Sequence, residues 1–269
     1  MTATATPQAP PRPAEDDRAL GVVPAHRRRT VRSRVSAWTT RHRESLLVLS
    51  PLLLLAGVVQ AWGMSRAPEA VDDEGTYTAQ AYAVEHLGRL AHYTYWYDHP
   101  PLGWLQIAGW TTLTDAFDRY SSAVSAGREA MLVAQLVSVA LVWALARRMH
   151  LTRAASALAI ALFALSPLAL AFHRMVYLDN VAVPWLLAAF VLAAPRRNEL
   201  LSFTGAAGCF AVAVLTKETV VLLAPVLLWW AWRHAAPSTR RYTFTVAGSL
   251  FVLLCCGYVA FAMLRGELL

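Results

Sequence analysis

Charged residues are scarce in this chain, and lysine and cysteine are almost missing. Only 15% of its 269 residues are charged, whereas soluble globular domains average about 25%. The chain has three cysteines, all inside apolar segments, which excludes a disulfide framework and a cysteine-based zinc site. The apolar runs between the charges approach about 20 residues, the length that indicates membrane helices.

The net charge of +7 does not indicate a nucleic-acid-binding protein, because the arginines do not form a basic domain. Many lie in the N-terminal tail and in short connections between apolar segments, which is the pattern that orients membrane helices. Residues 1–44 are rich in Ala, Pro and Arg and show no helical or strand period. We therefore expect a disordered basic tail there, and one transmembrane module over residues 45–269.

Seven apolar segments predict an all-α integral membrane fold. The first runs from Ser45 to Trp62. Its Val59-Gln60-Ala61 stretch could pass as a signal cleavage site, but the region before it is too long for a signal peptide. A polar and aromatic loop follows at about 64–122. The remaining spans are expected at about 124–146, 154–172, 180–194, 200–215, 219–232 and 242–263.

Two short helices are expected in the 64–122 loop. The first has its apolar residues at helical spacing, and the second opens at Pro100-Pro101, since proline suits a first helical turn. Amphipathic helices of this size can lie along a membrane surface. The residues expected to share one face are Tyr77, Ala81, Val84, Leu87 and Ala91 in the first helix, and Leu102, Leu105, Gly109 and Leu113 in the second.

The arginines predict the orientation of the spans. With seven spans, three arginine-bearing connections fall on the side of the N-terminal tail, and the positive-inside rule makes that side cytoplasmic. The opposite side then receives the acidic stretch 72–74, residues 173–179 and Lys217-Glu218. These polar islands are therefore expected to meet on the extracytoplasmic face. The arginines of the three connections are Arg147, Arg148, Arg153, Arg196, Arg197, Arg233, Arg240 and Arg241.

Three consecutive carboxylates, Asp72, Asp73 and Glu74, stand where a helix is expected to begin. One carboxylate suffices to cap a helix, because it accepts free backbone N–H groups and meets the positive end of the dipole. Three in a row repel one another unless cations or a ligand compensate. We favour a functional site, with a carboxylate acting as general base on an acceptor hydroxyl.

Other polar residues could complete such a site. Asp98 and His99 precede the proline pair, which would fix their direction. Arg174 has the planar fork that binds phosphate with two bonds, although it could instead pair with Asp179. Lys217 is the only lysine in the chain, and we expect it to contact a phosphate rather than only to pair with the neighbouring glutamate. A divalent metal is possible, but no ligand spacing supports one.

Together these residues resemble the GT-C superfamily of polyprenyl-phosphate-dependent glycosyltransferases, most closely the protein O-mannosyltransferase and aminoarabinose-transferase branch. The matching features are Asp73-Glu74 followed by Tyr77, the stretch from His99 to Gly103, Arg174 followed by Leu178-Asp179, and Lys217 between later spans. The resemblance implies a module of seven membrane helices with two juxtamembrane helices. Relatives usually continue with more helices, so it also implies that a chain ending at Leu269 is a fragment or a reduced member.

The resemblance implies roles for these residues. Asp73 corresponds to the catalytic carboxylate and Glu74 supports it, while Arg174, Lys217 and His99 become candidates for contact with the donor phosphate. Supporting or substrate contacts would come from Asp98, Tyr77 and Asp179.

The expected reaction moves a sugar from a polyprenyl phosphate to an extracytoplasmic acceptor, which could be a protein, a lipid or a glycan. The alternative is a non-catalytic lipid or sugar-lipid transporter or a binding subunit. A transporter should place its polar residues near the bilayer midplane, whereas here they lie at span ends.

Overall fold

The computed structural model describes residues 31–90, 99–195 and 197–264, and in these residues all regular secondary structure is helical. This confirms the predicted all-α class. The chain divides into two units, residues 1–43 and 44–269, and the site lies wholly in the second. The helices are α1 Val31–Ala61, α2 Asp72–Leu87, α3 Leu102–Thr114, α4 Ala116–Arg119, α5 Ala123–Arg148, α6 Arg153–Leu165, α7 Pro167–Arg174, α8 Leu178–Leu192, α9 Glu199–Thr216, the 3₁₀ helix η1 Glu218–Leu223, α10 Ala224–His234 and α11 Arg240–Leu264.

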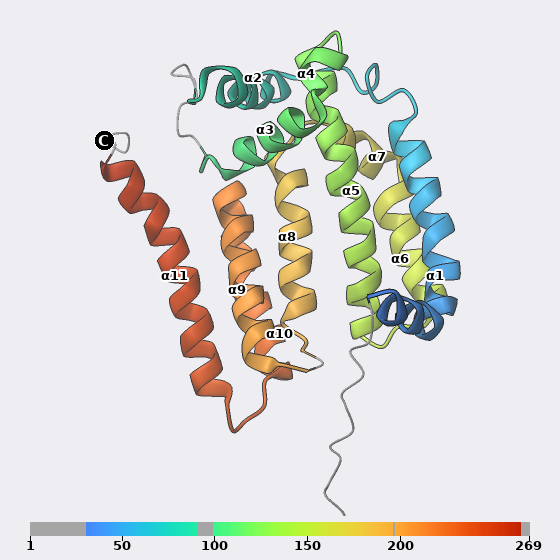
Figure 1. Cartoon of the computed structure of the whole chain (residues 1–269), viewed down its shortest axis with the longest axis vertical. Helices are drawn as coiled ribbons and strands as arrows, with labels where there is room; N and C mark the ends of the chain where they lie inside the picture. Colours follow the sequence, from blue (N-terminus) through green and yellow to red (C-terminus); the bar gives the residue numbers. More distant parts are fainter. Residues whose placement is uncertain (1–30, 91–98, 196, 265–269) are drawn as a thin grey trace, which may run out of the picture. The chain divides into compact units, whose positions relative to one another are not determined.

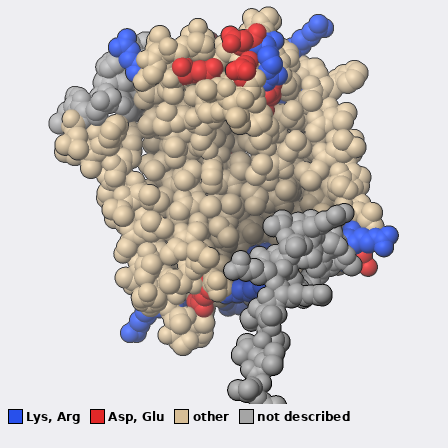
Figure 2. Space-filling model, in the orientation of Figure 1, with Lys and Arg blue, Asp and Glu red and all other residues tan. Residues whose placement is uncertain are grey.

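Four described helices are long and apolar enough to cross a membrane, namely Arg43–Ala61 of α1, α5, α9 and α11. A fifth span is formed if the bent pair α6 and α7 counts as one, and α8 is a shorter apolar helix. Helices therefore occupy all seven predicted segments, but not all of them reach full span length. Charged side chains gather at the two ends of the helices and leave an uncharged belt between them (Figure 2), as a membrane setting requires.

One break and one early start depart from a simple row of helices. The break between α6 and α7 falls at Ser166-Pro167, where the bend is 57°, because a residue before proline disfavours the helical conformation. Ser166 caps α7 by accepting a hydrogen bond from the backbone N–H of Ala169 at 3.4 Å. At the N-terminus, α1 begins at Val31, so the part of the predicted tail after residue 30 is helical. Arginine is a good helix former, and the predicted disorder of residues 1–30 lies outside the described residues.

Helices α2 and α3 lie across the ends of α5, α8 and α9 (Figure 1), as expected for the two helices of the 64–122 loop. A cluster of buried apolar side chains, centred on Trp104, Ile107 and Met131, joins α2, α3 and α5 to the start of α8. The close packing depends on Gly127 of α5, where an added Cβ would lie 2.6 Å from the Thr78 side chain. This layer fixes the backbone that carries the polar residues discussed next.

The residues expected to share one face of α3 do lie on one side of it, and that side is exposed rather than packed against the other helices. Leu105 and Leu113 are 42% and 78% exposed, whereas Trp104, Ile107 and Ala108 are buried. In a membrane setting an exposed leucine contacts lipid at little cost, so apolar residues mark the lipid-facing side as readily as the protein core.

Candidate active site

Four segments that are distant in sequence meet at the end of the helices where α2 and α3 lie. His99, just before α3, contacts Lys217 and Glu218 at the junction of α9 and η1. Glu74 of α2 accepts a hydrogen bond from the backbone N–H of Val176, in the link between α7 and α8. The segments that the sequence predicted to share one face therefore do come together.

Lys217, His99 and Glu218 form a continuous hydrogen-bonded array. The Lys217 Nζ lies 2.9 Å from His99 Nε2, and His99 Nδ1 lies 3.1 Å from both carboxylate oxygens of Glu218. An ammonium group can only donate, so Nε2 accepts from Lys217 and Nδ1–H donates to Glu218. Glu218 and Lys217 together hold the orientation of the imidazole.

Polar contacts beneath this array hold the end of α9 against α3 and α8. Thr216, immediately before Lys217, is fully buried, and its hydroxyl accepts a hydrogen bond from Gln106 Nε2 at 2.8 Å. Gln106 in turn accepts from Trp185 Nε1 of α8 at 2.5 Å. The ring of Tyr77, from α2, lies 6.0 Å from the ring of His99. Helix α2, the residue before α3 and the end of α9 therefore meet at this array.

A buried ion pair anchors the first turn of α2. Glu74 is fully buried and Arg128 of α5 is 2% exposed. Arg128 donates from Nε and Nη2 to the two carboxylate oxygens at 2.9 and 2.7 Å, and from Nη1 to the carbonyl of Met64 at 2.8 Å. Glu74 also accepts from the backbone N–H groups of Val71 and Val176. Because its oxygens are engaged and shielded from solvent, Glu74 holds the backbone at the start of α2, and a direct role in catalysis stays a prediction.

Asp73 is exposed in the same helical turn, and it lies one turn before Tyr77, on the same side of α2. Burial is the largest cause that raises the pKa of Tyr177 above its usual value, and the negative charges of Asp73, Glu74 and Asp179 raise it further. The exposed carboxylates of Asp73, on α2, and of Asp179, at the start of α8, therefore both act on the same tyrosine. The buried ion pair thus presents Asp73 to solvent next to the link between α7 and α8.

Arg174 is engaged with the end of α1. Its guanidinium donates to the carbonyls of Val59, Gln60 and Trp62 at 2.6, 3.1 and 2.8 Å, and more weakly to Ala67 at 3.4 Å. The last carbonyls of a helix have no partner within the helix, so Arg174 acts as a C-terminal cap for α1. A contact between Arg174 and a donor phosphate stays a prediction, and it would require some of these bonds to be exchanged.

Asp98 lies outside the described residues. Among the residues that are described, no three His, Cys, Asp or Glu side chains gather in a way that could hold a metal ion. The possible divalent metal therefore stays a prediction without a ligand set assigned to it.

The sequence reasoning missed Arg128 as a partner of Glu74 and Glu218 as a partner of His99. A signal existed for Arg128, because a charged residue inside a predicted span marks a buried pair or a functional site. Glu218 was considered only as an ion-pair partner of the adjacent Lys217, whereas it pairs with a histidine 119 residues away. Local sequence carries no information on such a long-range contact.

Comparison with known proteins identifies one family. The model of one family, described as dolichyl-phosphate-mannose-protein mannosyltransferase, matches residues 98–260. The match covers His99, Arg174 and Lys217 but begins after Asp73 and Glu74. Searches of curated proteins and of solved structures return no match. Since the matched region is more than half of the chain, the chain belongs to the dolichyl-phosphate-mannose-protein mannosyltransferase family and is a membrane glycosyltransferase of the mannosyltransferase type.

Proposed function

We propose that this protein transfers a sugar from a polyprenyl-phosphate donor to an extracytoplasmic acceptor, at the end of the helices where α2 and α3 lie. The observation that carries the proposal is the 2.9 Å contact between Lys217 Nζ and His99 Nε2. Lys217 is the only lysine of the chain, and the Tyr77 ring of α2, the helix that carries Asp73, lies 6.0 Å from the His99 ring. A cation and a carboxylate at one membrane surface are what transfer from a lipid phosphate needs.

Lys217 is the best-placed donor of hydrogen bonds to the phosphate. An ammonium has three N–H donors, and the contact with His99 uses one of them. The Glu218–His99 pair orients Lys217 without cancelling its charge, because the ammonium group of Lys217 contacts the imidazole of His99. We therefore assign phosphate binding to Lys217, with His99 beside it, and assign Arg174 mainly to the end of α1.

Asp73 is the proposed general base. The acceptor hydroxyl attacks the anomeric carbon of the donor sugar and loses its proton to the Asp73 carboxylate. The bond between the anomeric carbon and the phosphate oxygen breaks, and the polyprenyl phosphate leaves with the bonding electrons. Lys217 stabilises the charge that develops on the leaving phosphate, while Asp179 and Tyr177 border the space for the acceptor.

Two paired measurements test these roles. The variant Asp73→Asn keeps the shape of the side chain but cannot accept a proton, so sugar transfer from a synthetic polyprenyl-phosphate donor should fall by about 100- to 10,000-fold. The neighbouring Asp72→Asn is the control, since asparagine caps a helix about as well as aspartate. Near wild-type transfer by Asp73→Asn would eliminate Asp73 as the base.

The donor site is tested by binding rather than by turnover. Lys217→Ala should weaken the binding of polyprenyl phosphate to the purified protein, because it removes the cation nearest to His99. Asp73→Asn should leave this affinity nearly unchanged, since the proposed phosphate contacts lie elsewhere. Equal affinity of wild type and Lys217→Ala would show that the phosphate is bound by other residues.

A further inference from the structure

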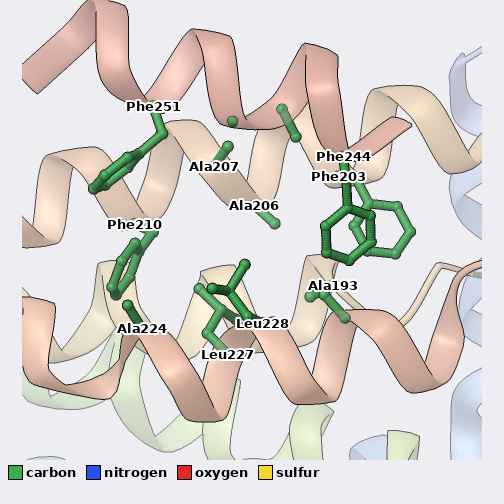
Figure 3. Close-up of a pocket in the computed structure, with 13 residues that line it drawn as sticks. Ala193, Phe203, Ala206, Ala207, Phe210, Ala224, Leu227, Leu228, Phe244 and Phe251 are labelled. Atoms are coloured by element: carbon green, nitrogen blue, oxygen red, sulfur yellow. The ribbon is translucent and has the colours of Figure 1, made fainter. Parts of the chain in front are cut away.

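An apolar groove lies between α10 and α11, with α9 as its floor (Figure 3). Its cavity volume is about 160 Å³. Small residues create the hollow, including Ala206 and Ala207 on the floor and Gly248 on the wall. Leu228 on the rim is 56% exposed, so the groove opens to the surface of the molecule rather than being enclosed.

Two aromatic pairs mark the ends of the groove. Phe203 and Phe244 have ring centroids 5.7 Å apart at one end, and Phe210 and Phe251 have centroids 5.4 Å apart at the other (Figure 3). Phe244 and Phe251 are two helical turns apart on α11, a length of roughly 10 Å. The groove therefore accommodates a segment of a single hydrocarbon chain.

The Phe203–Phe244 end of the groove continues into positive charge. Arg240 and Arg241 stand four and three residues before Phe244, so they extend the face of α11 that lines the groove. The guanidinium of Arg240 lies 4.3 Å from the Trp232 ring centroid, and Trp232 meets Phe244 edge to face at 5.7 Å. Among the described residues, Arg240 Nε is buried without a hydrogen-bond partner.

The other titratable groups nearby do not cancel this charge. The Glu199 carboxylate accepts hydrogen bonds from the Ala236 N–H and from the Thr239 hydroxyl, so it is occupied by the connection between α10 and α11. The His234 ring contacts the carbonyl of Trp230 within its own helix. Arg240 and Arg241 are thus left as the charges that continue the groove.

The apolar lining of this groove does not by itself explain which lipid the groove would select. Lipid tails are as apolar as the side chains that line it, so a chain entering from the membrane gains no hydrophobic energy. Selectivity must come from the charged end, where arginine favours phosphate. We propose that the groove binds one acyl chain of an anionic phospholipid, with the lipid phosphate held by Arg240 and Arg241. This site lies at the opposite end of the helices from the Lys217–His99 array (Figure 1).

The experiment is a lipid titration of the purified, delipidated protein, followed by native mass spectrometry. Phosphatidylglycerol and phosphatidylcholine with the same acyl chains are the two probes. We expect phosphatidylglycerol to bind more tightly, and Arg241→Gln, at an exposed position, to weaken its binding about fivefold. The combined Arg240→Gln and Arg241→Gln variant should weaken it roughly 25-fold. Arg153→Gln, which removes the same charge from the start of α6, should have no effect.

Filling the groove tests the acyl-chain contact separately. An added Cβ at Gly248 meets nothing within 4 Å, so Gly248→Phe fills the groove without a backbone clash and should abolish the phosphatidylglycerol adduct. Gly257→Phe is the matched control, because Gly257 is equally open and lies on α11 outside the groove.

Several outcomes would overturn the proposal. These are equal binding of the two phospholipids, an unchanged adduct in Gly248→Phe, a dimer that Gly248→Phe dissociates, and displacement of phosphatidylglycerol by polyprenyl phosphate. None of these measurements uses sugar transfer, so the result does not depend on the proposed function.

Discussion

Replacing Arg128 should destabilise the protein more than replacing almost any other buried residue. The substitution Arg128→Met keeps much of the length and removes the charge. It deletes three hydrogen bonds of 2.7 to 2.9 Å and leaves the fully buried carboxylate of Glu74 with only backbone donors. Breaking a buried pair from one side costs about 3–5 kcal/mol, whereas the loss of an exposed pair costs about 0.2–1 kcal/mol.

The assay is equilibrium unfolding in mixed micelles, followed by circular dichroism. The double variant Arg128→Met with Glu74→Gln should recover a large part of the loss, because the neutral amide still accepts from the backbone N–H of Val71 or Val176. A loss below about 1 kcal/mol for Arg128→Met, or a double variant less stable than the single one, would refute the reasoning that desolvation dominates this pair.

Three further predictions concern packing, electrostatics and topology. Gly103→Ala should destabilise by about 1–3 kcal/mol, because its Cβ would lie 2.7 Å from a leucine side chain of α8, whereas Gly109→Ala on the same helix meets nothing within 4 Å and should be neutral or stabilising in the same unfolding assay. Asp73→Asn should lower the pKa of Tyr177 toward its usual value, since it removes one of the negative charges that raise it; tyrosinate absorbance compared with Tyr177→Phe measures this, and an unchanged titration would place Asp73 away from Tyr177. Single cysteines at Glu69 or Tyr177 should react with an impermeant thiol reagent in intact cells, and protection of both would reverse the predicted orientation.

The fold could largely be predicted from the sequence, because the length of an apolar run directly indicates a membrane helix. Each predicted segment contains a helix, and the proline pair before α3 located the start of that helix, whereas the break before α7 was not predicted. The side of each helix that faces the protein core was harder to predict. The exposed Leu113 and the buried Trp104 of α3 are both apolar, so hydropathy cannot tell lipid-facing from core-facing positions.

The location of the candidate site could be predicted from the sequence, but the pairing of its side chains could not. Arginine distribution gathered the polar segments at one end, and the contact of His99 with Lys217 agrees with that. The sequence could not tell that Glu74 is buried against Arg128 while its neighbour Asp73 is exposed. Adjacent carboxylates look alike in a sequence, and only the packing of α2 on α5 makes one of them structural.

The cap that Arg174 provides for α1 also has a consequence for the order of assembly. Arg174 is made 112 residues after Trp62, the residue just after α1 whose carbonyl it contacts at 2.8 Å. At synthesis rates of about 5–20 residues per second, this delay is about 6–22 s. During that interval the end of α1 must be satisfied by water or by the insertion machinery, because the cap forms only when the third hydrophobic segment arrives. Helix α1 is therefore the first span to enter the membrane, and its end is capped only after the third of the seven predicted segments has been made.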